Sequence, residues 1–231
     1  MKKKLQKRGN MIGNIMIACL LFMATSVYAQ VTYNGNGNTG FGGAVGGSNM
    51  SVNDDGTTVT VSFTKGSGDF SDYMVMYIDN GSSGRSIIDS NVNDQGDNNR
   101  RAISSAGTNA SDITLPSGFE VTHAISIDVG FGGLWSIPST GTIGNSGLGF
   151  IDGVGSPTSN TSASFTFSFD WSEIGLTGSD DFKFVITYLN GDNGFLSNEG
   201  YGDGLPSSNP GAGNVTFDTY FEYSSGDEGG L

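Results

Sequence analysis

Six apolar or aromatic residues follow one another at positions 73–78, with Asp72 before them and Asp79 after them. The run is too short for a typical helix, and it lacks the alternation of a strand that has one wet face. It therefore predicts a strand near the middle of a sheet, covered on both faces. Asp79, at the end of this strand, should lie among loops, where ligands commonly bind.

Alternating patterns predict the strands on either side. Val59, Val61 and Phe63 alternate with polar residues and follow an Asn-Asp-Asp-Gly turn at 53–56, which is typical of a hairpin. Further strands are predicted at 121–129, 134–137, 148–151, 165–169, 182–189 and 215–223, and a brief helical turn is predicted at 172–175.

Short strands at close spacing, with hardly any helical pattern, predict an all-β fold. We expect an antiparallel β-sandwich of the jelly-roll or immunoglobulin-like kind, with about ten strands. The 38 glycines lie between regular apolar runs, so they indicate tight turns. Residues 30–224 are enough for a single domain with a large core, and residues 225–231 are expected to be a flexible tail or a truncated linker.

The first 29 residues predict a secretory signal peptide, because five Lys and Arg residues precede an apolar run at 15–23 and small residues suit cleavage after Ala29. The alternative is a lipoprotein signal acylated at Cys19, but the preceding residues match that signal poorly. No later segment has the roughly 20 apolar residues of a membrane helix. We therefore expect a secreted or cell-surface protein with no membrane insertion after signal cleavage.

The charge balance narrows the choice of partners. After residue 29 the chain has 5 basic and 23 acidic residues, a formal net charge of −18. Such a field repels nucleic acid and suits a soluble extracellular surface that holds divalent cations. The only cysteine, Cys19, belongs to the signal, so the cleaved chain forms no disulfide.

Oxygen-bearing side chains are concentrated after the central strand, and calcium prefers oxygen ligands. The EF-hand pattern fits imperfectly, because Asp94 stands where that pattern needs glycine and Arg100 where it needs glutamate. Two interpretations stay open, a solvated acidic loop and a calcium site of another geometry. The candidate ligands of a structural calcium ion are Asp79, Asp89, Asn91, Asn93, Asp94 and Asp97.

Two motifs are interpreted as structural. Residues 35–40 spell G-x-G-x-x-G, but no long strand precedes them and no helix pattern follows, so a glycine-rich turn is expected. His123 is the sole histidine and lies on the apolar side of the strand at 121–129. Without a second histidine or a cysteine nearby, a packed ring with a satisfied nitrogen is expected.

Residues 190–213 are predicted to form a long loop, which is typical of a functional segment. Aromatic rings stack on sugar rings, although a sandwich core also needs large aromatic residues. The candidate ligand-binding residues are Trp135, Trp171, Glu199 and Tyr201.

Short motifs along the chain resemble those of a group of secreted surface proteins of the Bacteroidota. They include Tyr-Asn-Gly-Asn-Gly-Asn at 33–38, Gly-Phe-Gly-Gly at 40–43, Gly-Asp-Phe-Ser-Asp-Tyr at 68–73, Arg-Ala-Ile-Ser at 101–104, Gly-Leu-Trp at 133–135, and the Glu199 region with Gly-Leu-Pro-Ser-Ser-Asn-Pro at 204–210. Members of this group commonly carry a C-terminal sorting domain for type IX secretion. The central strand that ends in Tyr-Ile-Asp at 77–79 is similar to that of family 9 carbohydrate-binding and DOMON-like sandwich domains.

Three functions stay open. The absence of a nucleophile paired with a base, together with the aromatic residues, favours a non-catalytic carbohydrate-binding module. The alternative is a glycoside hydrolase or lyase, since two suitably spaced carboxylates suffice for glycoside hydrolysis and Glu199 and Asp79 are the first candidates. A purely structural or adhesive surface protein is the third.

Overall fold

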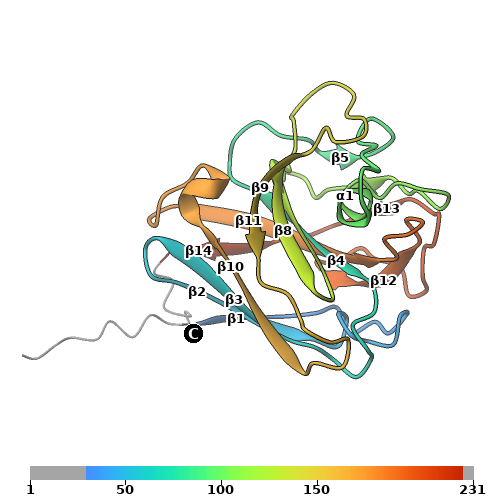
Figure 1. Cartoon of the computed structure of the whole chain (residues 1–231), viewed down its shortest axis with the longest axis horizontal. Helices are drawn as coiled ribbons and strands as arrows, with labels where there is room; N and C mark the ends of the chain where they lie inside the picture. The colour runs from blue at the N-terminus through green and yellow to red at the C-terminus, as the bar shows by residue number, and fades with distance from the viewer. Residues whose placement is uncertain (1–29, 226–231) are drawn as a thin grey trace, which may run out of the picture.

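The computed structural model describes residues 30–225, so the predicted signal peptide at 1–29 lies outside the described residues. Within this range the chain forms 14 strands in three sheets, one α-helix and one 3-10 helix (Figure 1). The prediction of an all-β sandwich is confirmed. The strands outnumber the expected ten partly because residues 87–88 and 113–114, which have no strand pattern, form two-residue strands, and because the strand predicted at 215–223 is divided into two.

The first sheet has four antiparallel strands in the order β1-β2-β3-β10. The predicted hairpin is present, with Gly56 at φ 85° in its turn. Phe165, Phe167 and Phe169 point into the core from the edge strand, and their polar neighbours point outward. The strands are β1 (Val31–Asn34), β2 (Asn49–Asp54), β3 (Thr58–Thr64) and β10 (Ser164–Asp170).

The second sheet has seven strands in the order β12-β11-β4-β7-β8-β9, and β14 also pairs with β11. Its strands are β4 (Tyr73–Asp79), β7 (His123–Asp128), β8 (Phe131–Ser136), β9 (Gly149–Val154), β11 (Asp181–Leu189), β12 (Leu196–Tyr201) and β14 (Phe221–Ser224).

The prediction for the central strand is confirmed, because β4 lies between β11 and β7 with both faces covered. Met74, Met76 and Ile78 belong to the hydrophobic core between the two large sheets. Val75 and Tyr77 point the other way, into a second core. A continuous apolar run is thus the expected pattern for this strand.

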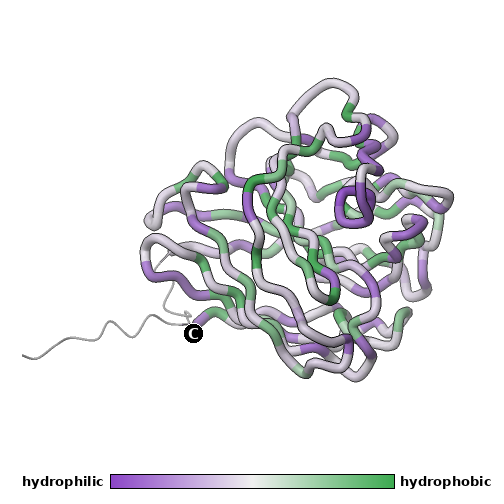
Figure 2. The backbone as a smooth tube through the Cα atoms, in the orientation of Figure 1, coloured by the Kyte–Doolittle hydropathy of each residue, from purple (hydrophilic) through white to green (hydrophobic). Residues whose placement is uncertain are grey.

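The second core is covered by a small third sheet and the α-helix α1 (Asn98–Ile103), at the upper right of Figure 1. This sheet contains β13 (Val215–Thr216), β6 (Ile113–Thr114) and β5 (Ile87–Ile88), and its β13–β6 pair is parallel, so the fold is not wholly antiparallel. Helix α1 is hydrophilic in Figure 2, and the sequence did not predict it. The Asp97 carboxylate caps it by accepting the Arg100 N–H, and Ala102 and Ile103 bury its apolar side.

Three local expectations need correction or refinement. The predicted loop at 190–213 contains the fully buried strand β12, and the strand predicted at 215–223 is interrupted to give β13 and β14. The predicted helical turn is present as η1 (Trp171–Ile174), ended by Gly175 at φ 75°. Among residues 30–225 no helix is long and apolar enough to cross a membrane.

Candidate functional site

The aromatic rings expected to stack on a ligand lie inside the protein. Trp135 and Trp171 are 2% and 1% exposed, and Tyr201 is fully buried. Trp171 stacks on Tyr223 at 6.1 Å between ring centroids, and the Tyr201 hydroxyl hydrogen-bonds to Ser48 at 2.7 Å. The prediction that these three rings present a surface to a glycan is therefore corrected, because the sandwich uses them in its cores.

Glu199 is also fully buried, on β12. Its Oε1 accepts the backbone N–H groups of Phe41 and Gly43 at 2.6 and 2.9 Å, and its Oε2 accepts those of Val45 and Gly46 at 2.9 and 3.1 Å. Four N–H donors leave this carboxylate no room for a substrate. Its predicted roles in ligand binding and glycoside hydrolysis are replaced by a structural one.

The glycine-rich turn predicted at 35–40 is part of a longer segment without strand or helix, residues 35–46, that packs against β12. The side-chain amides of Asn36 and Asn38 donate to the Asn198 carbonyl at 2.8 and 2.9 Å. A Cβ atom at Gly46 would lie 2.0 Å from the Asn38 carbonyl oxygen, so glycine is required by close packing.

His123 is half-buried, as expected for a packed ring. Its Nδ1 hydrogen-bonds to the Thr122 hydroxyl at 3.0 Å. Burial lowers the pKa of His123 to about 4, so the ring is neutral at physiological pH.

The six predicted calcium ligands do not gather around one point but make separate contacts within the protein. In residues 30–225 no group of three or more His, Cys, Asp or Glu side chains is placed to hold a metal ion. Asp79 is 4% exposed and accepts the N–H groups of Gly81 and Glu120 at 2.7 and 3.1 Å, with the Lys183 ammonium at 3.7 Å. It belongs to the end of the central strand and not to the acidic loop.

Asp94 is fully buried, and protein donors satisfy its carboxylate. Gly96, Ser146 and Leu148 donate backbone N–H groups at 3.0, 2.7 and 3.0 Å, and the Arg100 guanidinium lies at 3.0 Å. Burial alone would raise the pKa of Asp94, but these donors outweigh burial and lower it below its ordinary value. Arg100 thus provides Asp94 with the positive charge that the sequence analysis expected from a calcium ion.

The other predicted ligands are exposed or take part in local hydrogen bonds. Asp97 caps α1, and Asn91 donates twice to the Asp89 carboxylate, at 2.9 and 3.1 Å. Asn93 accepts a hydrogen bond from the Gln95 amide at 2.8 Å. Asp89 and Asn93 line a small pocket, and calcium binding in this loop stays a prediction.

The two most exposed phenylalanine rings in residues 30–225 lie on β8 and β9, at the edge of the seven-stranded sheet. Phe131 is 43% exposed and Phe150 is 50% exposed. They flank the buried Trp135 ring, with centroids 6.2 and 5.5 Å from it. We call the surface made by Phe131 and Phe150, which covers the buried Trp135 ring and lies beside Asp128, the aromatic face.

Gly133 lies between Phe131 and Trp135 on the same side of β8 and gives the aromatic face its shape. A Cβ atom there would lie 2.7 and 2.9 Å from two Trp135 ring atoms and 3.1 Å from a Phe150 ring atom. The indole therefore lies over Gly133, close to the backbone of β8, and Phe150 packs beside it. A glycine is needed for this close approach.

Asp128 lies directly across the β7–β8 hairpin from Phe131. Its Oδ1 is buried and has no hydrogen-bond partner in residues 30–225. Burial raises the pKa of the carboxyl above its ordinary value, an effect that hydrogen bonding from Tyr73 and Asn99 partly offsets. A buried carboxylate oxygen without a donor is costly, and a ligand hydroxyl that reached Asp128 would offset this cost by donating a hydrogen bond.

Phe131, Gly133 and Trp135 are spaced two residues apart, which places them on one side of a strand. The sequence alone could therefore have predicted that the two aromatic residues lie on the same side. The sequence does not show that Trp135 is buried between Phe131 and Phe150, because this burial depends on Gly133 and on the pairing of β8 with β9. Searches of known protein families, of curated proteins and of solved structures found nothing that matches this chain.

Proposed function

We propose that the protein is a secreted or cell-surface, non-catalytic module that binds carbohydrate through the aromatic face. The observation that carries the proposal is the pair of exposed rings, Phe131 and Phe150, on either side of Trp135 and next to an unpartnered oxygen of Asp128. Large exposed aromatic side chains that gather on one surface usually mark an interaction site.

The chemistry of this surface suits a sugar. The C–H groups on the face of a pyranose ring pack on aromatic rings, and its hydroxyl groups donate hydrogen bonds to carboxylates. Phe131 and Phe150 supply the apolar contacts, and Asp128 supplies an acceptor at their edge. Three adjacent strands, β7, β8 and β9, would then position both kinds of contact.

The charge of the chain favours neutral glycans. After residue 29 the formal net charge is −18, which opposes the approach of anionic polysaccharides and of nucleic acid. We therefore expect retention on neutral polysaccharides.

The glycoside hydrolase alternative loses its first candidates. Glu199 accepts four backbone N–H groups, and Asp79 is 4% exposed and accepts two backbone N–H groups next to Lys183. Glycoside hydrolysis needs two carboxylates that flank an accessible bond. These two side chains do not meet that requirement.

A depletion assay tests the proposal. The purified protein is mixed with insoluble cellulose, xylan, mannan, β-1,3-glucan or chitin, and the unbound fraction is measured. We expect retention on at least one of these solids, and we expect the Phe131→Ala/Phe150→Ala double variant to lose about 2 kcal/mol or more of binding free energy, about thirtyfold in affinity.

Phe195→Ala is the matched control, because Phe195 is 36% exposed but stacks on Phe41, a residue outside the aromatic face. It should bind like the wild type. No retention of the wild type on any of these solids, or equal loss in the control and the double variant, would contradict the proposal.

A further inference from the structure

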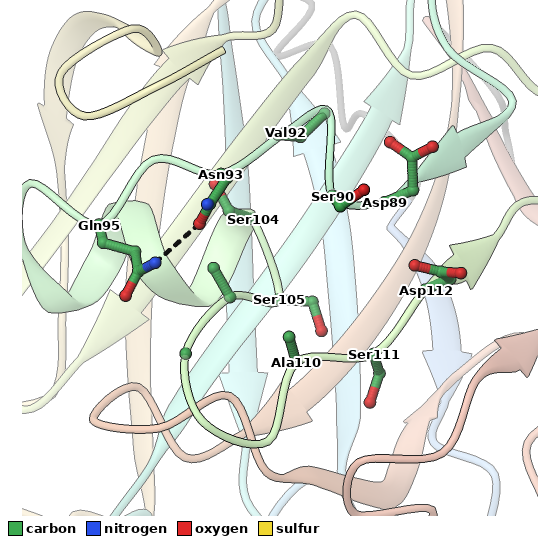
Figure 3. A pocket seen from close by; sticks show the side chains of 12 residues that line it. Asp89, Ser90, Val92, Asn93, Gln95, Ser104, Ser105, Ala110, Ser111 and Asp112 are labelled. Atoms are coloured by element: carbon green, nitrogen blue, oxygen red, sulfur yellow. Dashed lines mark hydrogen bonds between the residues drawn. The ribbon is translucent and has the colours of Figure 1, made fainter. Parts of the chain in front are cut away.

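A second site is the pocket between residues 89–95 and residues 104–112, at the C-terminal end of α1 (Figure 3). Its volume is about 170 Å³, enough for a small ligand with some water. Its polar lining comes from Asp89, Asn93, Gln95, Ser105 and Asp112, with further serines, and includes no Lys, Arg or His.

Ser105 is the most informative residue of this pocket. It follows the C-cap of α1 with φ 44°, a left-handed conformation that normally favours glycine. Ser105 is 1% exposed, and its hydroxyl has no hydrogen-bond partner in the described part of the chain. A buried hydroxyl without a partner destabilises a fold, and here the hydroxyl lines a pocket that a ligand could fill.

The pocket is also negatively charged. Asp89 and Asp112 come from its two different walls, and Figure 3 draws their carboxylates at the same end. Within residues 30–225, neither forms an ion pair with Lys or Arg. The Asp112 carboxylate accepts a hydrogen bond from the Asn214 amide at 3.1 Å, and the Asp89 carboxylate accepts two from Asn91.

The nearest arginines on α1 do not supply the missing charge. Arg100 binds Asp94, Asp97 and the Leu148 carbonyl, and Arg101 binds the Asn98 side chain and the carbonyls at 191–192. The carboxylates of Asp89 and Asp112 therefore attract a positive charge that no Lys or Arg of residues 30–225 supplies, so a bound cation would have to supply it.

We propose that this pocket binds a small cation, held by Asp89 and Asp112 with the Ser105 hydroxyl as a further ligand or acceptor. Carboxylate, hydroxyl and amide oxygens suit a hydrated calcium ion, and they equally suit a small primary ammonium group. The proposal gives the predicted calcium site a different ligand set, which adds Asp112 and Ser105 and omits Asp79, Asn91, Asp94 and Asp97.

Thermal unfolding of the purified protein tests the proposal after removal of metals with EDTA. Calcium, magnesium and methylammonium chloride are added at equal ionic strength. Tetraethylammonium, which has no N–H donor and carries four ethyl groups around its charge, controls for screening. We expect calcium or methylammonium to raise Tm by several degrees above this control. A calcium effect identifies a metal site, and a methylammonium effect identifies an organic ammonium site.

Three variants separate binding in the pocket from general screening. Asp112→Asn should weaken the affinity by about tenfold or more, because it removes one of two carboxylates. Ser105→Gly should keep or raise Tm without the cation and should reduce the shift that the cation causes. Asp69→Asn removes an exposed carboxylate outside the pocket and should keep the full shift.

The proposal is overturned if no small cation exceeds tetraethylammonium, or if Asp69→Asn reduces the shift as much as Asp112→Asn. Binding of glycans at the aromatic face has a separate readout, so failure of one proposal leaves the other intact.

Discussion

The Oε1 atom of Glu199 accepts the backbone N–H of Phe41 at 2.6 Å, although the two residues lie 158 positions apart. Three further N–H groups of the same glycine-rich segment complete the binding of this carboxylate. A buried negative charge is tolerated when several donors surround it. The contact explains why a segment without regular structure is held firmly against the edge strand β12.

Replacing Glu199 with glutamine tests this structural role. The amide nitrogen of glutamine cannot accept hydrogen bonds, so some of the four N–H groups would lose their partner. We expect a loss of about 3 kcal/mol in the free energy of unfolding and a fall in Tm on the order of 10 °C. Urea denaturation measures the loss. Glu222→Gln, at an exposed position on β14, is the control and should change stability by less than about 0.5 kcal/mol.

Asp94 should make stability depend on acid pH. The pKa of Asp94 is lowered in the folded state, so its ionised form stabilises the protein above the unfolded-state pKa of 3.8. That contribution is lost as pH falls through the lower folded-state pKa. We expect Asp94→Asn to reduce Tm strongly at pH 7 and much less at pH 2. A difference that does not depend on pH would contradict this account.

Asp128 should behave in the opposite way. Burial raises the pKa of Asp128 in the folded state, so its contribution to stability is present below the unfolded-state pKa of 3.8 and is lost as pH rises through the folded-state pKa. We expect Asp128→Asn to raise Tm at pH 7 by roughly 1–3 °C, while glycan binding weakens. Melting curves and depletion assays on one preparation measure both effects. A variant that is less stable at pH 7 would show that the carboxylate serves the fold.

Gly133 should be intolerant of even a methyl group. An added Cβ atom would lie 2.7 Å from the Trp135 ring, so the indole or the strand must shift. We expect Gly133→Ala to cost about 1–3 kcal/mol and to change the near-ultraviolet circular dichroism of the tryptophan. Gly153 pairs with Gly133, and a Cβ atom there would meet only one atom, at 3.9 Å. Gly153→Ala is therefore the control, and equal losses in both variants would contradict the packing argument.

The sequence predicts the strands whose pattern is local. The continuous run at 73–78 requires cover on both faces, and the structure supplies two hydrophobic cores for it. The alternation of Phe165, Phe167 and Phe169 likewise specifies one buried face. In both elements the burial pattern follows from neighbouring residues in the chain.

The elements that the sequence did not predict depend on distant partners. Strand β12 has the sequence Leu-Ser-Asn-Glu-Gly-Tyr, a polar pattern that predicts a loop. It is a buried strand because N–H donors at 41–46 satisfy the Glu199 carboxylate. The short helix α1 is hydrophilic and depends on the Asp97 cap and on two buried residues. The choice of aromatic residues failed for the same reason, because exposure is set by strand pairing and by Gly133, neither of which composition reveals.

The most direct test of the central claim uses the indole of Trp135 as a reporter. Trp171 is the only other tryptophan, so Trp171→Phe leaves Trp135, between Phe131 and Phe150, as the single tryptophan, which can be excited apart from the tyrosines. This variant is titrated with soluble hexasaccharides of cellulose, xylan, mannan, β-1,3-glucan and chitin. The account predicts a saturable change in Trp135 emission with the glycan that the depletion assay identifies, and no such change in the Phe131→Ala/Phe150→Ala background. Retention on a polysaccharide without any change in Trp135 emission would place the binding site elsewhere and contradict the account.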